Sequence, residues 1–399
     1  MCIRDSLYQL QIGDLRPVSD PIPLSVPHLS GNEWKYVKEC LDTNAVSAVG
    51  RFIELFERKV ADFTGATSAV ATVNGTSALH VALRVLDVGP GDEVICPDFT
   101  FVAPVNAVRY CGAVPVLLDV SRDSATLDPM AVAAFLKDGC KRVAGQTINR
   151  RTDRRVKALL PVHMYGHPAD LDPLREMASE HGLFMVEDAA ECLGAEYKGV
   201  RIGKSGDLVC LSFNGNKVVT AGCGGMVLAS RPEWSRRARH LVTQARSHPT
   251  DYIHDEIGFN YRLPNLNAAI GCAQMENLDL HLKRKRQIAD SYAQAIREIP
   301  GLSMLCEREW ASSTYWLNTM LIDREVYGRD VVETMNALTA SGIQARRVWP
   351  PLHSQAPYRD CPHSGSPHSQ WMFEHALNLP SSVGLSDSDL SRVIAALRG

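Results

Sequence analysis

The stretch Ala69-Val-Ala-Thr-Val-Asn-Gly-Thr-Ser-Ala-Leu-His-Val-Ala-Leu-Arg-Val-Leu86 joins a strand pattern directly to a helix pattern. A short apolar run ends at Val73, and a helical spacing of apolar residues begins at Ser77. Between them lie Asn74-Gly-Thr-Ser77, which are residues that commonly start helices. A strand that leads straight into a helix is the repeating unit of an α/β sheet protein.

The same unit recurs along the chain. Short Val-, Leu- and Ile-rich runs, typical of strands covered on both faces, lie at residues 69–73, 93–96, 114–119, 156–162, 183–187, 207–212 and 225–229. Helical patterns lie at residues 33–42, 52–63, 77–86, 104–110, 129–137, 172–181 and 233–245. We therefore predict an α/β fold over residues 26–268, with a mostly parallel seven-stranded sheet between helices.

The chain of 399 residues is long enough for two domains. After residue 268 the pattern changes, because a long charged helix predicted over 267–296 is followed by shorter mixed elements. We interpret residues 269–399 as a smaller C-terminal α+β domain and residues 1–25 as an N-terminal segment. The basic run Lys283-Arg-Lys-Arg286 is interpreted as a solvated helix face rather than a nucleic-acid patch.

The composition excludes several classes of protein. A net charge of -3, with 45% hydrophobic and 22% charged residues, gives no basic excess for binding nucleic acid. No apolar run reaches the length of a membrane span, and Met1–Asp14 lacks the apolar core of a secretory signal. The 11 cysteines are scattered singly, as reduced thiols usually are, and the 13 histidines include no H-E-x-x-H motif. We predict a cytoplasmic protein without a metal site.

Polar groups follow the strand that ends at Val73. There the free backbone N–H groups of a helix start meet the hydroxyls of Thr76 and Ser77, an arrangement that binds a phosphate dianion. Capping of the helix by either hydroxyl is the alternative. Ser212 ends another predicted strand and is a further candidate phosphate donor.

Asp188 and Lys217 follow two further strands. A carboxylate at a buried strand end needs a compensating cation, either a protonated pyridine nitrogen or a cationic side chain of the protein. Lys217 lies in a Gly/Asn-rich loop and can form an imine with an aldehyde, although most lysines are solvated surface charges. Phe101 offers a ring for stacking or for core packing. Together, a phosphate seat, a stacking face, a carboxylate and a lysine are what pyridoxal phosphate (PLP) requires.

Six motifs carry a resemblance to a known family. They are Asn74-Gly-Thr-Ser-Ala-Leu-His80, Pro97-Asp-Phe-Thr-Phe-Val102, Pro161-Val-His-Met-Tyr-Gly166, Glu187-Asp-Ala-Ala190, Ser212-Phe213 with Lys217, and Gly258-Phe-Asn-Tyr-Arg262. In this order they resemble the DegT/DnrJ/StrS family of sugar aminotransferases, from about Ile22 to about Tyr358. The resemblance implies the fold-type-I architecture of PLP-dependent transferases, PLP as the cofactor, and a homodimer with shared active sites.

The resemblance also implies roles around the cofactor ring. Lys217 would form the Schiff base, Asp188 would pair with the pyridine nitrogen, and Phe101 would stack on the ring. Glu191 stands where many members have Gln, near the PLP phenolic oxygen. His163 would help to position the cofactor or the sugar, with a satisfied strand-end histidine as the alternative.

The resemblance also implies which residues bind the phosphate of the cofactor and the carboxylate of the amino donor. The cofactor phosphate would be held by Thr76, Ser77 and Ser212, together with Asn260 from the neighbouring subunit. Arg262 would bind the carboxylate of the amino donor, glutamate. The implied reaction moves the amino group of glutamate to a nucleotide-linked keto sugar in two half-reactions.

Two further segments suggest the sugar. Pro23-Leu-Ser-Val-Pro-His-Leu-Ser-Gly-Asn-Glu-Trp34 and Val348-Trp-Pro-Pro-Leu-His353 resemble enzymes that aminate C4 of UDP-linked 4-keto-6-deoxy-N-acetylhexosamines in bacillosamine-type and legionaminic-acid-type pathways. Asn44 and Ala45 depart from the Gly and aromatic residue expected before Val46. A PLP-dependent nucleotide-sugar dehydratase, which tends to lack the lysine, and a non-catalytic regulator with the same fold are the alternatives.

Overall fold

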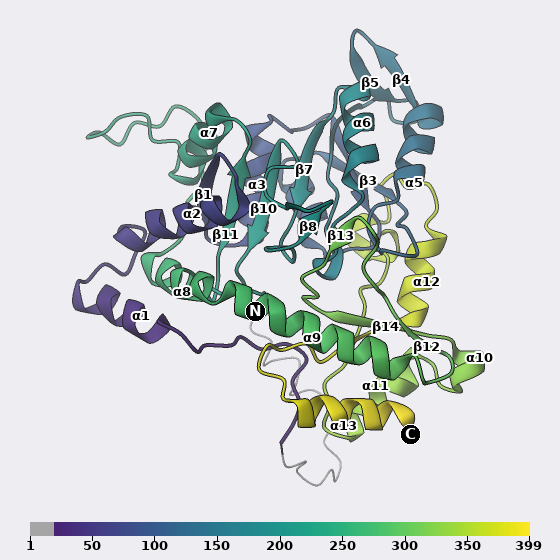
Figure 1. The fold of residues 1–399 in the computed structure, drawn as a ribbon. Helices are drawn as coiled ribbons and strands as arrows, with labels where there is room; N and C mark the ends of the chain where they lie inside the picture. Colours follow the sequence, from purple (N-terminus) through teal and green to yellow (C-terminus); the bar gives the residue numbers. More distant parts are fainter. Residues whose placement is uncertain (1–19) are drawn as a thin grey trace.

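A computed structural model describes residues 20–399, and its larger sheet has nine strands (Figure 1). All seven predicted strands are present and form a continuous path, in the order β1-β11-β10-β7-β6-β2-β3. They are β1 (Ser68–Thr72), β2 (Asp92–Pro97), β3 (Val114–Leu118), β6 (Arg155–Leu159), β7 (Phe184–Asp188), β10 (Leu208–Ser212) and β11 (Gly225–Ala229). From β10 to β3 all neighbours pair in parallel, whereas β11 is antiparallel to β1 and β10. The mostly parallel sheet is confirmed.

Helices connect these strands, as the alternating pattern predicted. They are α1 (Glu33–Asp42), α2 (Arg51–Thr64), α3 (Gly75–Val85), α4 (Ala103–Tyr110), α5 (Pro129–Ala134) with a π-helical turn at Phe135–Gly139, α6 (Leu171–His181) and α7 (Pro232–Val242). Local residues set their ends: Asp128 caps α5 ahead of Pro129, and Gly65 and Gly182 end α2 and α6 with φ of 72° and 61°. The packed helices leave the sheet strands almost wholly buried.

A hairpin that the sequence did not reveal extends the sheet. Its strands, β4 (Cys140–Val143) and β5 (Gln146–Asn149), pair antiparallel, and β5 also pairs antiparallel with β6. Figure 1 shows the hairpin projecting beyond the other strands. The prediction of seven strands is therefore wrong, because this hairpin adds two more strands to the sheet. Its residues carry no apolar pattern.

The long helix predicted over residues 267–296 is two helices. α8 (Asn265–Glu276) and α9 (Leu278–Ile296) are separated by Asn277, which has φ of -109° and ψ of 5°. The interpretation of the basic run on α9 as a solvated face is wrong for Lys285, which is 3% exposed. Its Nζ donates to the carbonyl oxygens of Trp316 and Ser381, at 3.1 and 2.8 Å. A buried amine thus holds two loops of the C-terminal part together.

The C-terminal part contains a second, wholly antiparallel sheet, in the order β12-β14-β16-β15. Its strands are β12 (Leu302–Met304), β14 (Asn318–Ile322), β15 (Arg346–Arg347) and β16 (Ala376–Leu379). Residues of α9 and of α11 (Val331–Ala340) and α13 (Asp387–Arg398) share a core with this sheet. The remaining elements are β8 (Glu196–Tyr197), β9 (Val200–Arg201), β13 (Ala311–Ser312), α10 (Arg324–Tyr327) and α12 (Pro367–His375), with short 3-10 turns at Met164–Gly166, Leu352–Ser354 and Ala356–Tyr358.

The structure can be compared with the predicted domain boundaries at two positions in the chain. Residues 1–19 of the predicted N-terminal segment lie outside the described residues, and Ile22 forms a parallel bridge with Ile343 of the C-terminal part. The boundary at 268/269 falls within α8, which packs against α1 and α2. The division into domains stays a prediction. Within residues 20–399, no helix is both long and apolar enough to cross a membrane.

Candidate active site

The end of β1 and the start of α3 form the first wall of the site. Oδ1 of Asn74 accepts from the backbone N–H of Ser77 at 2.8 Å, so Asn74 caps α3, and neither Thr76 nor Ser77 does. A Cβ on Gly75 would stand 2.8 Å from Cβ of Ser212, so only glycine lets the end of β10 approach this closely. Hydroxyl-bearing residues thus gather at a helix N-terminus, where the dipole favours an anion.

Asp188 ends β7 in the middle of the sheet and is 5% exposed. Its Oδ1 accepts from the backbone N–H of Ala190 at 3.0 Å, and among residues 20–399 no other group donates a hydrogen bond to this carboxylate. Burial raises the pKa of Asp188, and the hydrogen bond from Ala190 and the charge of Lys217 oppose that rise only in part. A further cation would therefore be stabilised here.

Lys217 lines the same cavity as Asp188, from the loop after β10. Its Nζ lies 3.1 Å from Oε1 of Glu191 and 3.7 Å from the centre of the Trp316 ring. Burial raises the pKa of Glu191, and the ion pair with Lys217 counteracts this. The other carboxylate oxygen of Glu191 accepts from the backbone N–H of Tyr165 at 2.7 Å. Glu191 therefore fixes the position of the Lys217 amine.

His163 follows the end of β6 and is fully buried. Its Nδ1 accepts from the backbone N–H of Ala169 at 3.0 Å, and its Nε2 lies 3.0 Å from a carboxylate oxygen of Glu187. Because Nδ1 accepts, Nε2 carries the proton and donates to Glu187. Both ring nitrogens thus have hydrogen-bond partners within the protein, which fits the alternative of a satisfied strand-end histidine. Only the face of the ring is left to contact a ligand.

These residues surround one cavity of about 370 Å³. It brings together seven of the ten residues singled out from the sequence, namely Thr76, Phe101, His163, Asp188, Glu191, Ser212 and Lys217. Ser77 is buried beside Thr76, whereas Asn260 and Arg262 are exposed and do not line the cavity. The carbonyl of Tyr261, between them, accepts from the N–H of Val73 at 2.8 Å, so this segment lies next to the end of β1.

Three cavity residues that the sequence did not single out come from the C-terminal part: Trp316, Arg346 and Trp349. The Trp349 ring lies 5.7 Å from that of Phe101, which is 51% exposed, at an angle of 52°. Trp349 lies within the segment Val348–His353 that carried the substrate resemblance, and this segment was the available signal for it. No sequence signal pointed to Arg346 or Trp316, because their contact with the sheet is tertiary.

Comparison with known proteins agrees with this geometry, because a model of the DegT/DnrJ/EryC1/StrS aminotransferase family matches residues 27–398. The chain belongs to this family. GDP-perosamine synthase of Caulobacter vibrioides is 38% identical over 383 residues, which cover 94% of this chain and 97% of that protein. The enzyme of the same name from Vibrio cholerae is 35% identical over 94% of this chain and 98% of that protein. The crystal structure of DesI in the presence of its TDP-sugar product, 29% identical, matches with a TM-score of 0.85 over 96% of this chain and 93% of that chain.

As a member of the DegT/DnrJ/EryC1/StrS family, the chain is a PLP-dependent aminotransferase. Its residues fit the cofactor on observations of this structure. Gly75 lets Ser212 approach the N-terminus of α3, where the helix dipole favours a phosphate, and Asp188 is a buried acid whose Ala190 contact leaves it in need of a cation. Lys217 is held in the same cavity for the aldehyde.

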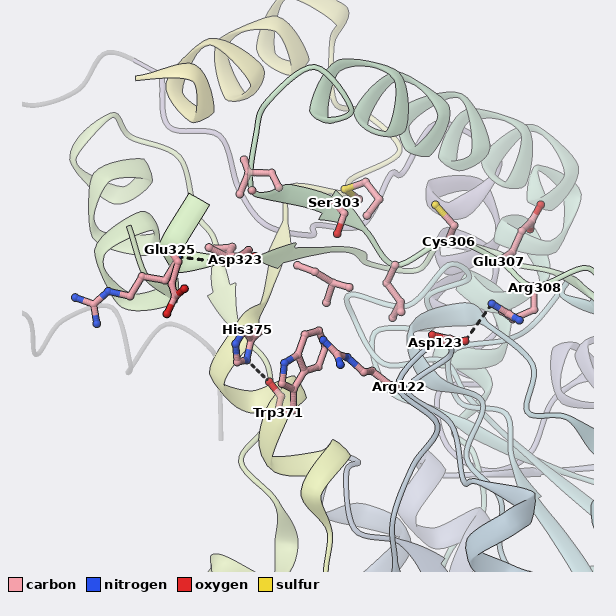
Figure 2. Close-up of a pocket in the computed structure, with 17 residues that line it drawn as sticks. Arg122, Asp123, Ser303, Cys306, Glu307, Arg308, Asp323, Glu325, Trp371 and His375 are labelled. Atoms are coloured by element: carbon pink, nitrogen blue, oxygen red, sulfur yellow. Dashed lines mark hydrogen bonds and ion pairs between the residues drawn. The ribbon is translucent and has the colours of Figure 1, made fainter. Parts of the chain in front are cut away.

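A larger cavity, of about 830 Å³, runs along β12 and α12 and contains none of the predicted site residues (Figure 2). The guanidinium of Arg122 lies 3.7 Å from the centre of the Trp371 ring, and Arg308 pairs with Asp123 at 3.3 Å. Protein side chains thus already engage both of these arginines. Because a site is identified by its chemical groups rather than its size, we place the chemistry in the smaller cavity.

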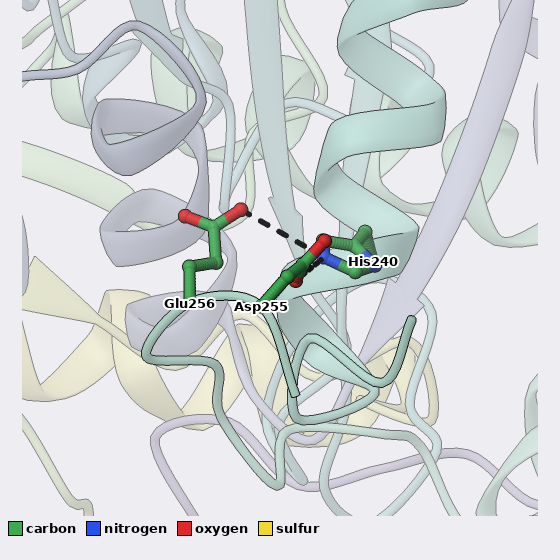
Figure 3. A group of neighbouring side chains, drawn as sticks. All are labelled: His240, Asp255 and Glu256. Atoms are coloured by element: carbon green, nitrogen blue, oxygen red, sulfur yellow. Dashed lines mark hydrogen bonds and ion pairs between the residues drawn. The ribbon is translucent and has the colours of Figure 1, made fainter. Parts of the chain in front are cut away.

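One group of potential metal ligands comes together within residues 20–399: His240, Asp255 and Glu256 (Figure 3). The imidazole of His240 lies 2.7 Å from Asp255 and 3.8 Å from Glu256. Arg237 already donates to Glu256, at 3.0 and 3.3 Å. Since a protein cation neutralises that carboxylate, the group gives no reason to assign a metal.

Proposed function

We propose that this protein transfers the amino group of glutamate to C4 of a nucleotide-linked 4-keto-6-deoxy sugar, with PLP bound in the cavity of Lys217. The observation that carries the proposal is the convergence of Lys217, Asp188 and the N-terminus of α3 on one cavity. Bound PLP supplies an aldehyde that links to amines and a ring that withdraws electrons.

The residues of this chain divide the work around that chemistry. Thr76, Ser77 and Ser212 bind the phosphate at the helix N-terminus. Asp188 holds a proton at the pyridine nitrogen by charge pairing. Lys217 would anchor the cofactor, and its amine would carry the proton that leaves Cα of the amino donor. Glu191 keeps the lysine amine oriented through the 3.1 Å contact.

Two lines of support bear on the sugar nucleotide. The relatives named GDP-perosamine synthase, at 38% and 35% identity, support a GDP-linked sugar. The segments Pro23–Trp34 and Val348–His353 favour a UDP-linked N-acetylhexosamine in surface glycan or nonulosonic acid biosynthesis. We propose the GDP-linked 4-keto-6-deoxyhexose as the substrate, with the UDP-linked sugar as the second candidate. Purified enzyme offered both in parallel should aminate the GDP-linked one faster, and the reverse ranking would reject this choice.

The glutamate step is tested by absorbance. The purified protein should have the yellow band of a lysine-bound PLP, lose it on addition of glutamate, and release 2-oxoglutarate. Lys217→Ala should show neither change. Release of ammonia without 2-oxoglutarate would favour the dehydratase, and a protein that never acquires the band would favour the regulator.

We propose a homodimer in which Asn260 of a second copy reaches the cofactor phosphate and Arg262 binds the carboxylate of glutamate. Exposure of both side chains outside the cavity supports a role completed by another chain. Mixing inactive Lys217→Ala with inactive Asn260→Ala protein tests it. Each hybrid dimer should regain one intact site, about half the activity of a wild-type dimer, if the sites are shared, and absence of any recovery would contradict sharing.

A reducing compartment suits the thiols of this protein. All ten cysteines within residues 20–399 are free, and eight of them are buried, including Cys96, Cys192 and Cys210. Burial raises the pKa of these thiols, which keeps them unreactive. Together with nucleotide-sugar substrates, this supports action in the cytoplasm.

A further inference from the structure

Arg346 is a cation in the active-site cavity to which none of the predicted cofactor contacts is assigned. The cavity is lined by two cationic side chains, Lys217 and Arg346, of which Lys217 is paired with Glu191. Among residues 20–399, no side chain or backbone group makes a hydrogen bond or ion pair with the Arg346 guanidinium, which stays exposed at the cavity wall. Guanidinium groups carry five donors in a planar fork that matches carboxylate and phosphate oxygens.

The strand that carries Arg346 explains its direction. β15 is an edge strand whose two residues pair with Asn378 and Leu377 of β16. Successive side chains of a strand point to opposite faces. The Arg347 guanidinium lies 3.6 Å from the centre of the Phe373 ring, and its Nε donates to the Phe373 carbonyl at 3.1 Å. Arg347 thus packs against α12, and Arg346 points to the opposite face, which is the side of the cavity.

The cofactor phosphate has its proposed seat on a different element of the cavity. The proposed phosphate seat lies at the N-terminus of α3, in the large sheet, whereas Arg346 belongs to the small sheet. Under the proposed function, both substrates bring further oxyanions, because glutamate is a dicarboxylate and a nucleotide sugar carries a diphosphate. Arg262, the residue predicted for the donor carboxylate, is outside the cavity of its own chain.

We propose that Arg346 is a substrate-binding residue that receives an oxyanion, a carboxylate of the amino donor or a phosphate of the sugar nucleotide, opposite the cofactor. This inference rests on the proposed function and deepens it. Trp349, which lines the same cavity and stacks at 5.2 Å on the buried Tyr165, provides a rigid apolar flank beside the guanidinium. An apolar flank lowers the local dielectric and strengthens a charge-assisted hydrogen bond.

The test is binding of two unreactive anions to the PLP-loaded protein by titration calorimetry. Glutarate represents the dicarboxylate, and GDP represents the nucleoside diphosphate. We expect Arg346→Gln to weaken one of them about 10-fold or more, the size of one lost charged hydrogen bond at an exposed group. Arg346→Lys, which keeps the charge without the fork, should recover part of the loss.

Arg347→Gln is the matched control, because it removes the same charge from the neighbouring residue on the other face of β15. Weakening of glutarate alone assigns Arg346 to the donor carboxylate, and weakening of GDP alone assigns it to the diphosphate. The inference is overturned if neither affinity changes by more than about twofold, if wild-type protein binds neither anion, or if Arg347→Gln weakens binding equally.

The same samples separate this inference from the proposed function. If wild-type protein fails to release 2-oxoglutarate from glutamate while Arg346→Gln still weakens an anion, the amino-transfer proposal fails and the anion site stands. In an active enzyme, loss of the contact should raise KM for the affected substrate more than it lowers kcat, since the contact is present before the reaction.

Discussion

Lys217 and Glu191 form an ion pair in the lining of the active-site cavity, and its strength can be measured by removing each partner in turn. The three variants are Lys217→Met, Glu191→Gln and the double variant, all studied without cofactor. Lys217→Met leaves Glu191 and Asp188 as two buried carboxylates without a lysine. Glu191→Gln leaves Lys217 with Asp188 still nearby, so the first variant should be the more destabilised.

The magnitude follows from the geometry. Two unit charges 3.1 Å apart interact by about 5 kcal/mol at an effective dielectric constant of about 20. The side chains of Lys217 and Glu191 are 13% and 7% exposed, so water reduces this interaction. We expect a coupling free energy of about 2 to 3 kcal/mol between the two substitutions, within the range for buried pairs.

The effect of pH has a definite sign. Burial raises the pKa of Asp188 and Glu191 above their values in the unfolded chain, and Lys217 limits this rise. The folded protein therefore retains protons that the unfolded chain has lost, and the free energy of unfolding falls as pH rises. Without Lys217 the fall should be steeper at pH values above the ordinary carboxyl range of about 4, because the lysine no longer opposes the rise in the two pKa values.

Urea unfolding at pH 6 and pH 8 provides the measurement. Lys198, whose ion pair with Asp172 lies on the surface at 2.5 Å, supplies the control cycle with Lys198→Met and Asp172→Asn. That pair should couple by less than about 1 kcal/mol. A Lys217–Glu191 coupling below about 0.5 kcal/mol, or a Lys217→Met variant that gains stability as pH rises, would refute the reasoning.

Three further predictions concern stability. Burial lowers the pKa of Lys285 to about 7. Between pH 7 and the higher pKa of this lysine in the unfolded chain, the free energy of unfolding should therefore rise with pH, by at most about 1.4 kcal/mol per pH unit. Urea titrations of Lys285→Met should show no such slope, and a slope equal to that of the wild type would contradict the prediction. Gly166 has φ of 100°, and a Cβ there would stand 2.2 Å from Oγ1 of Thr314, so Gly166→Ala should lower the free energy of unfolding by about 2 kcal/mol or more. Gly145 has φ of 80° and open space around it, so Gly145→Ala should lower the free energy of unfolding less. Equal losses in the two variants would contradict the steric argument. Asn265 is 1% exposed and forms hydrogen bonds with two backbone groups, at 3.0 and 2.7 Å. Asn265→Ala should therefore lower the free energy of unfolding by about 2 kcal/mol. An unchanged midpoint of urea unfolding would contradict this, because it would mean that the two backbone groups had found other partners.

Local patterns predicted the large sheet because its strands are buried on both faces. The run Leu208–Ser212, for example, is apolar at four consecutive positions, and the structure buries all four. The hairpin of β4 and β5 escaped this prediction, since it buries the polar residues Thr147 and Asn149 and exposes Val143, and β5 is held in place by pairing with β6. A strand held at a sheet edge needs no apolar pattern of its own.

The break between α8 and α9 could not be predicted from periodicity. Asn277 interrupts two stretches that each have good helical spacing, and its bend lets α8 pack on α1 and α2 while α9 packs in the second core. Lys285 was assigned to solvent for a similar reason. Charge alone predicts exposure, and only the carbonyls of Trp316 and Ser381, brought from distant segments, make its burial tolerable.

The sequence by itself determined the strand-helix order and the cofactor residues that follow strand ends, because such residues are placed by their own strand and turn. That reasoning found Thr76, Ser212, Asp188 and Lys217, which the fold brings to one cavity. Only the tertiary structure decided what faces them. The pairing of Lys217 with Glu191 depends on β10 lying beside β7 in the large sheet. The wall that Arg346 adds depends on how the small sheet packs against the large one, and no local pattern encodes either contact.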